Sequence, residues 1–583
     1  MITLIGVIYF YRYINIYISI YIFIKIENIN NLYLYNTQIT SFRYTMSDLV
    51  SQSSLNQIEI NFNQWLTDHA SDIHKIRVAT KESDNSATFF NDYYKWSMMG
   101  EINKVVDAFK RKNNTQIITT FDVDIRDKTF KQQILYDISL QNKVYESISK
   151  LAHKKFNPIL FEQICKQYSH LDMSNFKHLF ETSLIDRVQY GQYFPDETST
   201  EVVVSIFIAN DESIESDESD ESVVEKPKKF YIRVTGPWQR VTWCETTIMQ
   251  AVYNTFILST DNYEKLLHDS LYRCYRVCNL INILNLSIRP DNPLLIALFS
   301  GRRTLSEEFL VLQNYMVAEL LNNAIGTSSV DSWFILNSIK LTNFTRTNSD
   351  GSFKFLKPVG THAHEISMVL GVLFNYLDDN SDGLPLSQLL GHGLFWQHSN
   401  KRSKVLPMPT LSDTISSQIF FRAAAELSVD SIPFKEIFKG ARQDSGDTDD
   451  FISLLRLNGF QFKAMASEIG SESDIYKVIS NLEYSTAGIG GFLGDSPAID
   501  GGKAISMAVK VVQVQIGNKI IGYALKLGDG VGKISIDTTL PLVHQKFIIN
   551  RALSMIEKSK LPITNLQESQ QLLNDAFTFI NDD

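Results

Sequence analysis

Residues 438–447 read Phe-Lys-Gly-Ala-Arg-Gln-Asp-Ser-Gly-Asp, a short apolar run that passes directly into a polar glycine turn. A run of this length is typical of a buried strand, and the Ser-Gly pair after it is typical of a loop. Similar runs at 356–359, 462–466 and 509–516 alternate with amphipathic helical patterns such as the one at 306–323. Alternation of this kind over roughly 250 residues predicts a parallel, barrel-like α/β domain.

Two polar motifs are expected on loops that follow strands, where barrel enzymes place their active sites. The turn after residue 441 carries the carboxylates of Asp444 and Asp447, and Gly-Thr-His-Ala-His-Glu at 360–365 supplies His364 and Glu365 after an apolar run that we interpret as a strand. Imidazole can take or pass a proton or a phosphoryl group near neutral pH. Carboxylates suit sugar hydroxyls and a Mg²⁺-bound phosphate. Together the motifs predict phosphoryl or phosphoribosyl chemistry.

Length and composition limit the class of protein. A chain of 583 residues is too long for one core, so two or more domains are expected. The net charge of −10 argues against sequence-independent binding of nucleic acid, which needs a basic surface. The four cysteines form no Cys-x-x-Cys pair, which indicates reduced thiols in a cytosolic protein.

The N-terminal 45 residues differ in composition from the rest of the chain. Residues 1–25 are nearly all Ile, Tyr, Phe, Leu and Val, but Arg12 interrupts them and no small-residue cleavage site follows. Ile, Tyr, Asn, Phe and Lys, which are frequent in this segment, have A/T-only codons, so we interpret residues 1–45 as a non-native or disordered leader and Met46 as the initiator. A genuine membrane anchor is the alternative, and we do not expect it.

An acidic Ser/Asp/Glu segment at 210–229 divides two apolar runs, 202–208 and 230–234. Such composition cannot bury a core, so we predict a disordered loop that joins two adjacent strands and serves as a solvated spacer rather than a phosphorylation site. We predict a mixed α/β-rich domain over 46–242 and the catalytic barrel over 243–540. A C-terminal helical segment, 541–583, is expected to complete the β-rich domain.

Six motifs, spread in order over roughly residues 85–540, resemble those of one enzyme family, the nicotinate phosphoribosyltransferases. They are Asp-Tyr-Tyr-Lys-Trp-Ser-Met at 92–98, Phe-Ser-Gly-Arg-Arg-Thr-Leu-Ser at 299–306, Gly-Thr-Ser at 326–328, Gly-Thr-His-Ala-His-Glu at 360–365, Arg-Gln-Asp-Ser-Gly-Asp at 442–447 and Gly-Ile-Gly at 488–490. Each motif is weak by itself, whereas the ordered set is specific.

The resemblance implies a type II phosphoribosyltransferase architecture, with an irregular α/β barrel, a β-rich second domain and a cytosolic homodimer that shares its active sites. It implies that nicotinate and 5-phosphoribosyl-1-pyrophosphate form nicotinate mononucleotide and pyrophosphate, the first step of NAD salvage from nicotinate. ATP hydrolysis through a phosphohistidine would drive the reaction, which places the enzyme among the ligases, with Mg²⁺ as cofactor. A nicotinamide-specific enzyme and a catalytically silent regulatory relative are the alternatives.

The resemblance also assigns roles to individual residues. His364 is the expected phosphohistidine, and Asp444 would hold the ribose hydroxyls, with Glu365 as a third catalytic candidate. The candidate substrate-binding residues are Tyr94 (from the partner subunit) and Phe299 around the pyridine ring, Arg302 at a carboxylate or phosphate, and Thr361, Asp413, Arg442, Ser445 and Gly446. Gly488, Gly490 and Gly491 are candidates for binding phosphate, and Asp444 and Asp447 for Mg²⁺.

Simpler interpretations remain open for several of these residues. His364 could be a zinc ligand or a structural histidine, and Arg302 could lie on a solvated surface. Phe299 and Tyr94 could be core aromatic residues. The chain also departs from the family pattern at Leu298, Ser300 and Gly491. None of these departures removes a residue that is assigned to the chemistry.

Overall fold

The structure is a computed structural model that describes the chain in separate ranges. These ranges are 51–82, 104–125, 128–153, 182–191, 201–210, 228–257, 263–298, 307–321, 324–326, 364–377, 383–400, 409–467, 472–489, 498–499, 503–504, 507–529, 534–559 and 566–581. The chain divides into a unit of residues 1–54 and a unit of residues 55–583. Of the first unit only residues 51–54 are described, so the predicted leader lies outside the described residues.

One sheet, the β-rich sheet, has the strand order β16-β15-β1-β4-β3-β2. All its pairs are antiparallel except β2–β3. Its strands are β1 (Ile117–Ile125), β2 (Arg187–Tyr190), β3 (Val203–Asn210), β4 (Lys228–Pro237), β15 (Met507–Ile516) and β16 (Lys519–Tyr523). The predicted pairing of the runs on either side of the acidic segment is confirmed, since Val203 pairs with Thr235 and Asn210 with Lys228. The strands extend to residues 210 and 228, and the acidic residues between them lie outside the described residues.

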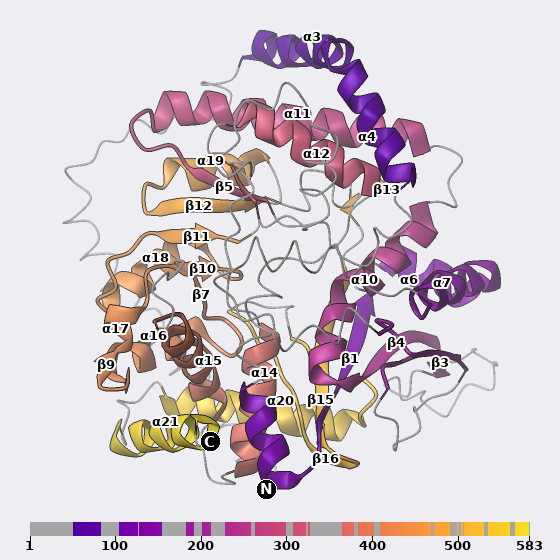
Figure 1. The fold of residues 1–583 in the computed structure, drawn as a ribbon. Helices are drawn as coiled ribbons and strands as arrows, with labels where there is room; N and C mark the ends of the chain where they lie inside the picture. The colour runs from indigo at the N-terminus through magenta and orange to yellow at the C-terminus, as the bar shows by residue number, and fades with distance from the viewer. Residues whose placement is uncertain are drawn as a thin grey trace, which may run out of the picture. The chain divides into compact units, whose positions relative to one another are not determined.

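The second sheet, the parallel sheet, has the order β6-β5-β12-β11-β10-β7 and every pair in it is parallel (Figure 1). Its strands are β5 (Leu295–Leu298), β6 (Ala324–Gly326), β7 (Thr410–Leu411), β10 (Ala441–Gln443), β11 (Ala464–Ala466) and β12 (Tyr484–Ile489). The order follows the chain cyclically, because the last strand, β12, lies beside the first, β5. This is the strand order of a barrel. Among the described residues β6 and β7 do not pair, so the barrel is irregular, and the α/β fold class is confirmed.

Helices connect these strands and cover the sheets. In chain order they are α3 (Gln52–Asp68), α4 (Ala70–Glu82), α6 (Lys128–Tyr136), α7 (Ile138–Leu151), α10 (Trp238–Ile257), α11 (Tyr263–Ile288), α12 (Glu307–Leu320), α14 (His364–Leu377), α15 (Gly383–Asn400), α16 (Ser417–Glu426), α17 (Phe434–Ile437), α18 (Thr448–Leu457), α19 (Glu472–Ser480), α20 (Leu542–Ser559) and α21 (Leu566–Asn581). Short pairs β8 (Ser428–Val429) with β9 (Ile432–Pro433), and β13 (Ala498–Ile499) with β14 (Lys503–Ala504), complete the described elements. The helix predicted over 306–323 is confirmed as α12.

Helix α14 packs against β15 and β16 of the β-rich sheet. Gly522 of β16 approaches it so closely that a Cβ there would lie 2.7 Å from Val372 Cγ1. A larger residue at this position would therefore push α14 away from the sheet, so close packing explains why the residue is glycine. The close fit fixes α14 and places its first residue, His364, at a defined position.

Strand β15 corrects the predicted domain division. The run at 509–516 was assigned to the barrel segment 243–540, but β15 pairs with β1 in the β-rich sheet. Its first residues alternate between buried and half-buried, as in a strand that covers a core with one face, and Lys510 lies among the half-buried positions. Alternation of this kind is typical of antiparallel sheets, whereas strands of a parallel barrel are apolar throughout.

The C-terminal helices predicted over 541–583 are present as α20 and α21. Helix α21 packs beside α15, where Phe577 lies over Gly393 and leaves no room for a Cβ. Its Gln570 side chain also exchanges hydrogen bonds with the backbone of Ser428, in β8. Helix α21 therefore packs on α15 and β8, whereas Ala552 of α20 packs with Leu525 and Leu527 after β16, and the prediction that the segment completes the β-rich domain stays a prediction.

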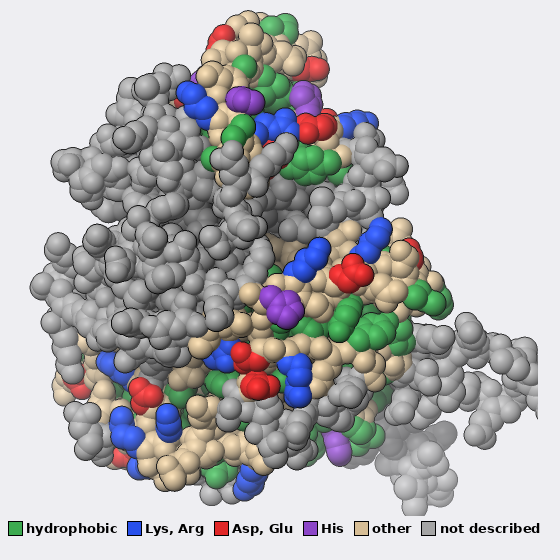
Figure 2. Space-filling model, turned by 45° about the vertical axis from the view of Figure 1, so that its right-hand side comes forward, with side chains coloured by type: hydrophobic (Ala, Val, Ile, Leu, Met, Phe, Trp, Pro, Cys, Tyr) green, Lys and Arg blue, Asp and Glu red, His purple; other side chains and the backbone are tan. Residues whose placement is uncertain are grey.

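Charges of both signs lie interspersed on the face drawn in Figure 2, where Lys and Arg side chains alternate with Asp and Glu over the described residues. A basic stripe of the kind that binds nucleic acid is absent from the described part of this face. None of the helices within the described ranges has both the length and the apolar character needed to cross a bilayer. Cys274 and Cys278 lie buried on α11, where neither forms a disulfide bond within the described residues.

Candidate functional site

Three polar side chains follow neighbouring strands of the parallel sheet at the same edge. Asp444 comes directly after β10, Asp413 follows β7 and Ser467 follows β11. Leu411 pairs with Arg442, and Gln443 pairs with Ala466. Because the carboxyl ends of parallel strands meet at one edge of the sheet, the three side chains converge there.

Direct hydrogen bonds connect this edge. Ser467 Oγ donates to Asp444 Oδ1 at 2.7 Å, and Arg442 Nη2 donates to the same oxygen at 3.1 Å. Arg442 also donates from Nε to Ser467 Oγ at 2.7 Å. The Asp444 carboxylate is thus held in one orientation from one side, and its Oδ2 is directed to other partners.

His364 is the first residue of α14 and is buried against this edge. His364 and Glu365 were expected on a loop that follows a strand, and they lie instead in the first turn of a helix; the apolar run at 356–359 lies outside the described residues. The His364 ring has Nδ1 3.0 Å from Thr414 Oγ1 and Nε2 3.1 Å from Asp444 Oδ2. Gln388 Nε2 donates to Thr414 Oγ1 at 3.1 Å and fixes that hydroxyl.

Lys526 joins the cluster from a segment distant in sequence. Its Nζ lies 2.6 Å from His364 Nε2 and 3.5 Å from Asp444 Oδ2. Leu525 and Leu527 on either side belong to a small apolar cluster with Ile415. Residue 526 pairs with Ser535 in an isolated bridge, and side chains alternate in extended chain, so the two leucines anchor the segment while the ammonium faces the site.

These contacts assign the tautomer of His364. His364 Nε2 has two competing neighbours: the ammonium of Lys526 at 2.6 Å, which only donates, and the carboxylate of Asp444 at 3.1 Å, which only accepts. The shorter contact favours an Nε2 that carries its lone pair and accepts from Lys526. The proton of the neutral ring is then on Nδ1, where it is donated to Thr414 Oγ1. Burial and the charge of Lys526 lower the pKa of His364, against the opposing effects of Asp413 and Asp444. A neutral imidazole whose Nε2 carries a lone pair can act as a nucleophile once the lone pair is released from the Lys526 ammonium.

Asp444 keeps its charge in this buried place. Burial by itself raises the pKa of a carboxyl group, but Lys526 and Arg442 outweigh it and hold the pKa of Asp444 well below its usual range. A negative charge next to a neutral, nucleophilic imidazole is a pairing that buried clusters at functional sites often show.

The Ser445-Gly446 turn holds Asp413 in place. Ser445 Oγ donates to Asp413 Oδ2 at 2.5 Å, and Ser445 Oγ accepts from the backbone N–H of Asp529 at 2.9 Å. Gly446 has φ +79°, in the left-handed region that favours glycine. Burial raises the pKa of Asp529 to about 6, although hydrogen bonds from Ser417 oppose the shift.

Glu365 faces the β-rich sheet rather than the cluster. Its Oε1 accepts from Lys510 Nζ, on β15, at 2.5 Å, and Lys510 also lies 3.8 Å from Glu245. Glu365 thereby ties the first turn of α14 to the sheet. The contact gives Glu365 a role in positioning His364.

His364, Asp413 and Asp444 each present a ligand atom within 4.8 Å of the other two, the spacing of a cation site among the described residues. The Asp413 Oδ1 atom is buried, lies 3.5 Å from His364 Nε2, and accepts no hydrogen bond from the residues that the structure describes. Because the Lys526 ammonium occupies the Nε2 side of His364, the two carboxylates form the better donor pair, and oxygen donors are the ones that Mg²⁺ prefers. The residues present therefore fit Mg²⁺ through Asp413 and Asp444.

The structure brings six predicted site residues together: His364, Asp413, Arg442, Asp444, Ser445 and Gly446. Gly488 lies in β12 of the same sheet, paired with Ala297. Asp447 caps α18 by accepting from the N–H groups of Asp449 and Asp450 and is not in the cation cluster, so its predicted role at Mg²⁺ stays a prediction. Tyr94, Phe299, Arg302, Thr361, Gly490 and Gly491 lie outside the described residues.

Sequence reasoning missed Lys526, Thr414 and Ser467. A signal existed for Lys526, because Tyr-Ala-Leu-Lys-Leu-Gly at 523–528 places a single cation between apolar neighbours, and a buried lysine needs a partner. Ser467 offered no signal, since a serine after a strand is common.

Comparison with known proteins gives one sequence relative and several structural ones. Over 240 residues the chain is 27% identical to a nicotinate phosphoribosyltransferase of Desulforapulum autotrophicum, which covers 41% of this chain and 50% of the relative. The chain thus matches half the length of that curated relative. No protein-family model matches the chain.

Three solved structures are similar over 82% of this chain. They are a nicotinate phosphoribosyltransferase from Porphyromonas gingivalis (15% identity, TM-score 0.53, all of that chain covered), one from Vibrio cholerae (15%, 0.53, 96% covered) and a putative one from Saccharomyces cerevisiae (16%, 0.52, 98% covered). The fold is that of the type II phosphoribosyltransferases, and the resemblance found in the motifs is confirmed.

Proposed function

We propose that this chain is a nicotinate phosphoribosyltransferase that forms nicotinate mononucleotide from nicotinate and 5-phosphoribosyl-1-pyrophosphate and couples the reaction to ATP through His364. The observation that carries the proposal is the contact of a buried, neutral His364 with the ionised Asp444 and with Lys526 at the carboxyl edge of the parallel sheet. The fold, and the sequence similarity over 240 residues, supply the substrate class.

The transfer step needs a charge arrangement that this edge provides. The bond between ribose C1 and the pyrophosphate oxygen breaks, the electron pair leaves with pyrophosphate, and the ring nitrogen of nicotinate donates its lone pair to C1. Positive charge develops on the ribose, and the fixed Asp444 carboxylate stabilises it by preorganised electrostatics. Mg²⁺, held by Asp413 and Asp444, would supply positive charge for the pyrophosphate.

The coupling step uses the other half of the cluster. The Nε2 lone pair of His364 attacks the γ-phosphorus of ATP, the bond to the ADP oxygen breaks, and ADP leaves with that electron pair. The proton on Nδ1 stays with the ring and is held by Thr414. Lys526, at 2.6 Å from Nε2, can then neutralise oxygens of the phosphoryl group.

A single assay tests the reaction. The purified chain is incubated with phosphoribosyl pyrophosphate, Mg²⁺ and either nicotinate or nicotinamide, with and without ATP, and the mononucleotide is measured. We expect strong preference for nicotinate and stimulation by ATP. Equal use of the two bases, or no product from either, would contradict the proposal.

A labelling experiment tests the phosphohistidine. With γ-labelled ATP, the wild-type chain and His362→Ala should carry acid-labile, base-stable label, whereas His364→Ala should carry none and should keep some ATP-independent transfer. His362 is the matched control because it offers an imidazole two residues away. Label that is lost in His362→Ala but kept in His364→Ala would overturn the assignment.

We extend the proposal to a cytosolic homodimer in which Tyr94 of one subunit contributes to the site of the other. Sedimentation of the purified chain tests the assembly. Mixing inactive Tyr94→Ala with inactive Asp444→Asn chains tests the shared site, because mixed dimers should regain part of the activity. A monomer with full activity would exclude this arrangement.

A further inference from the structure

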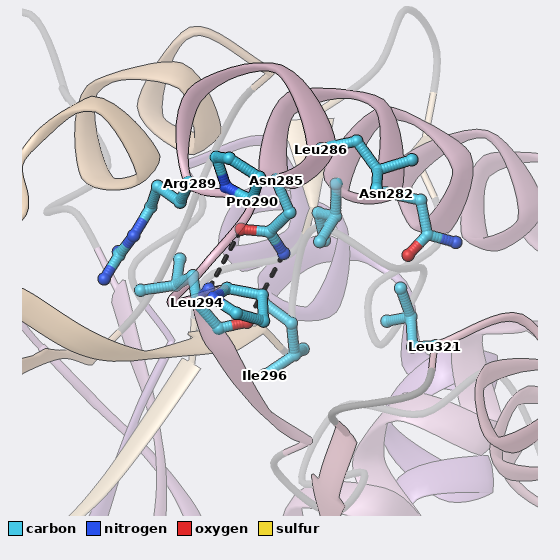
Figure 3. Close-up of a pocket in the computed structure, with 10 residues that line it drawn as sticks. Asn282, Asn285, Leu286, Arg289, Pro290, Leu294, Ile296 and Leu321 are labelled. Atoms are coloured by element: carbon cyan, nitrogen blue, oxygen red, sulfur yellow. Dashed lines mark hydrogen bonds between the residues drawn. The ribbon is translucent and has the colours of Figure 1, made fainter.

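A cavity of about 300 Å³ lies between the C-terminal end of α11 and the start of β5 (Figure 3). Its apolar walls include Ile281, Leu286, Leu294, Ile296 and Leu321, and among the described residues that line it Arg289 is the one cationic side chain. Leu286 is 75% exposed, which places the mouth of the cavity on this side of α11. The volume is within the range of small-molecule sites.

Arg289 is the unusual member of this lining. The residue is 3% exposed, and in the part of the chain that the structure describes none of its three guanidinium nitrogens has a hydrogen-bond partner. Arg233 is equally buried, but its charge is compensated by two carboxylates, Asp122 at 2.6 Å and Asp537 at 2.8 Å. A buried guanidinium keeps its charge, so a cation without a counter-ion is a large electrostatic cost unless an anion joins it.

The other polar side chains of the cavity are already engaged. Asn285 accepts from the N–H of Leu294 at 2.9 Å and donates to the C=O of the same residue at 3.5 Å, as the dashed lines of Figure 3 show. Asn282 donates to the C=O of Leu320 at 2.7 Å. One forked cation surrounded by apolar walls therefore defines the chemistry of the site.

We propose that this cavity binds a small monocarboxylate with an apolar body, whose two oxygens pair with the Arg289 guanidinium. The fork of donors matches a carboxylate in a bidentate arrangement, and the apolar walls take the body of the ligand. An inorganic phosphate dianion would bring a second charge that no other cation of the lining compensates.

The site is distinct from the His364 cluster. It lies at the amino end of β5, whereas Asp413, Asp444 and Ser467 follow the carboxyl ends of their strands, and all strands of this sheet are parallel. The two sites are thus at opposite edges of the sheet, and the proposal does not rest on the proposed function.

Calorimetric titration of the full chain with sodium hexanoate tests the site, with hexan-1-ol and inorganic phosphate as separate probes. Hexanoate should bind at one site, and both hexanol and phosphate should bind more weakly. Arg289→Leu should weaken hexanoate binding at least about tenfold, the effect expected for hydrogen bonds to a charged group. Arg273→Leu, a half-buried arginine on the same helix, is the matched control and should bind as the wild type does.

The outcomes separate the alternatives. Leu286→Trp provides a second variant at an exposed position, and it should also weaken binding by narrowing the mouth. Absence of hexanoate binding, equal binding by Arg289→Leu, or phosphate binding as tight as hexanoate would overturn the proposal. Binding of hexanoate that nicotinate displaces equally well from the wild type and from Arg289→Leu would place it in the His364 site instead. If Arg289→Leu changed the sedimentation coefficient while hexanoate did not bind, the cavity would belong to an interface between copies of the chain.

Discussion

Replacing Lys526 by methionine isolates its electrostatic effect on His364. Methionine keeps the unbranched, apolar part of the side chain and removes the ammonium, which lies 2.6 Å from His364 Nε2. The ammonium opposes protonation of the ring, so its loss raises the pKa of His364. A like charge at this range changes a pKa by about 1–2 units.

The direction in which the pH dependence of labelling shifts follows from the protonation state that His364 needs as a nucleophile. Phosphoryl transfer needs the Nε2 lone pair, which protonation removes, so label incorporation falls as pH falls through the pKa of His364. In Lys526→Met the pH at which the labelling rate falls to half, on the acidic limb of the pH–rate curve, should be higher by about 1–2 units. Asp444 keeps Arg442 at 3.1 Å and stays ionised, which leaves ATP-independent transfer less affected.

The assay is the initial rate of labelling from γ-labelled ATP between about pH 5 and pH 8, the range in which histidine titrates. Lys519→Met, an exposed lysine on β16, is the control and should leave the limb in place. The reasoning is refuted if the limb of Lys526→Met does not move, or if it moves to lower pH.

Three further predictions concern the same edge of the sheet. Asp444→Asn should abolish mononucleotide formation and lower the free energy of unfolding by about 3 kcal/mol, because it removes the carboxylate that pairs with the buried Lys526 and Arg442. Activity and urea denaturation measure the two effects. Gly446→Ala should lower the free energy of unfolding by about 1–2 kcal/mol, because φ +79° is strained for alanine. The substitution should also raise the KM for phosphoribosyl pyrophosphate. A melting curve identical to that of the wild type would contradict the first expectation. Asp529→Asn should raise the free energy of unfolding by about 3 kcal/mol at pH 8 and have little effect at pH 4. A carboxyl group whose pKa is raised to about 6 destabilises the fold only as pH rises through the window from about 4 to about 6. Melting curves at the two pH values measure the difference.

The sequence alone was enough to locate the part of the site that lies on strand ends. Apolar runs at residues 438–441 and 462–466 predicted strands, and the parallel arrangement then placed the residues after them at one edge. Asp444 was found in this way because a strand and its following loop are local consequences of hydrophobic pattern, whereas Asp413 was proposed only from the family resemblance. The fold class followed for the same reason.

The tertiary structure decided what depends on contacts between distant segments. Lys526 contacts His364 from 162 residues away in the sequence. Strand β15 belongs to the β-rich sheet and not to the barrel, because it pairs with β1, a strand so much earlier in the chain that no local pattern identifies it as the partner. Burial of Arg289 without a partner likewise depends on how α11 meets β5. A local pattern specifies which face of an element is apolar, but the charges that face one another in a buried site are set by packing, and packing joins residues that the sequence keeps far apart.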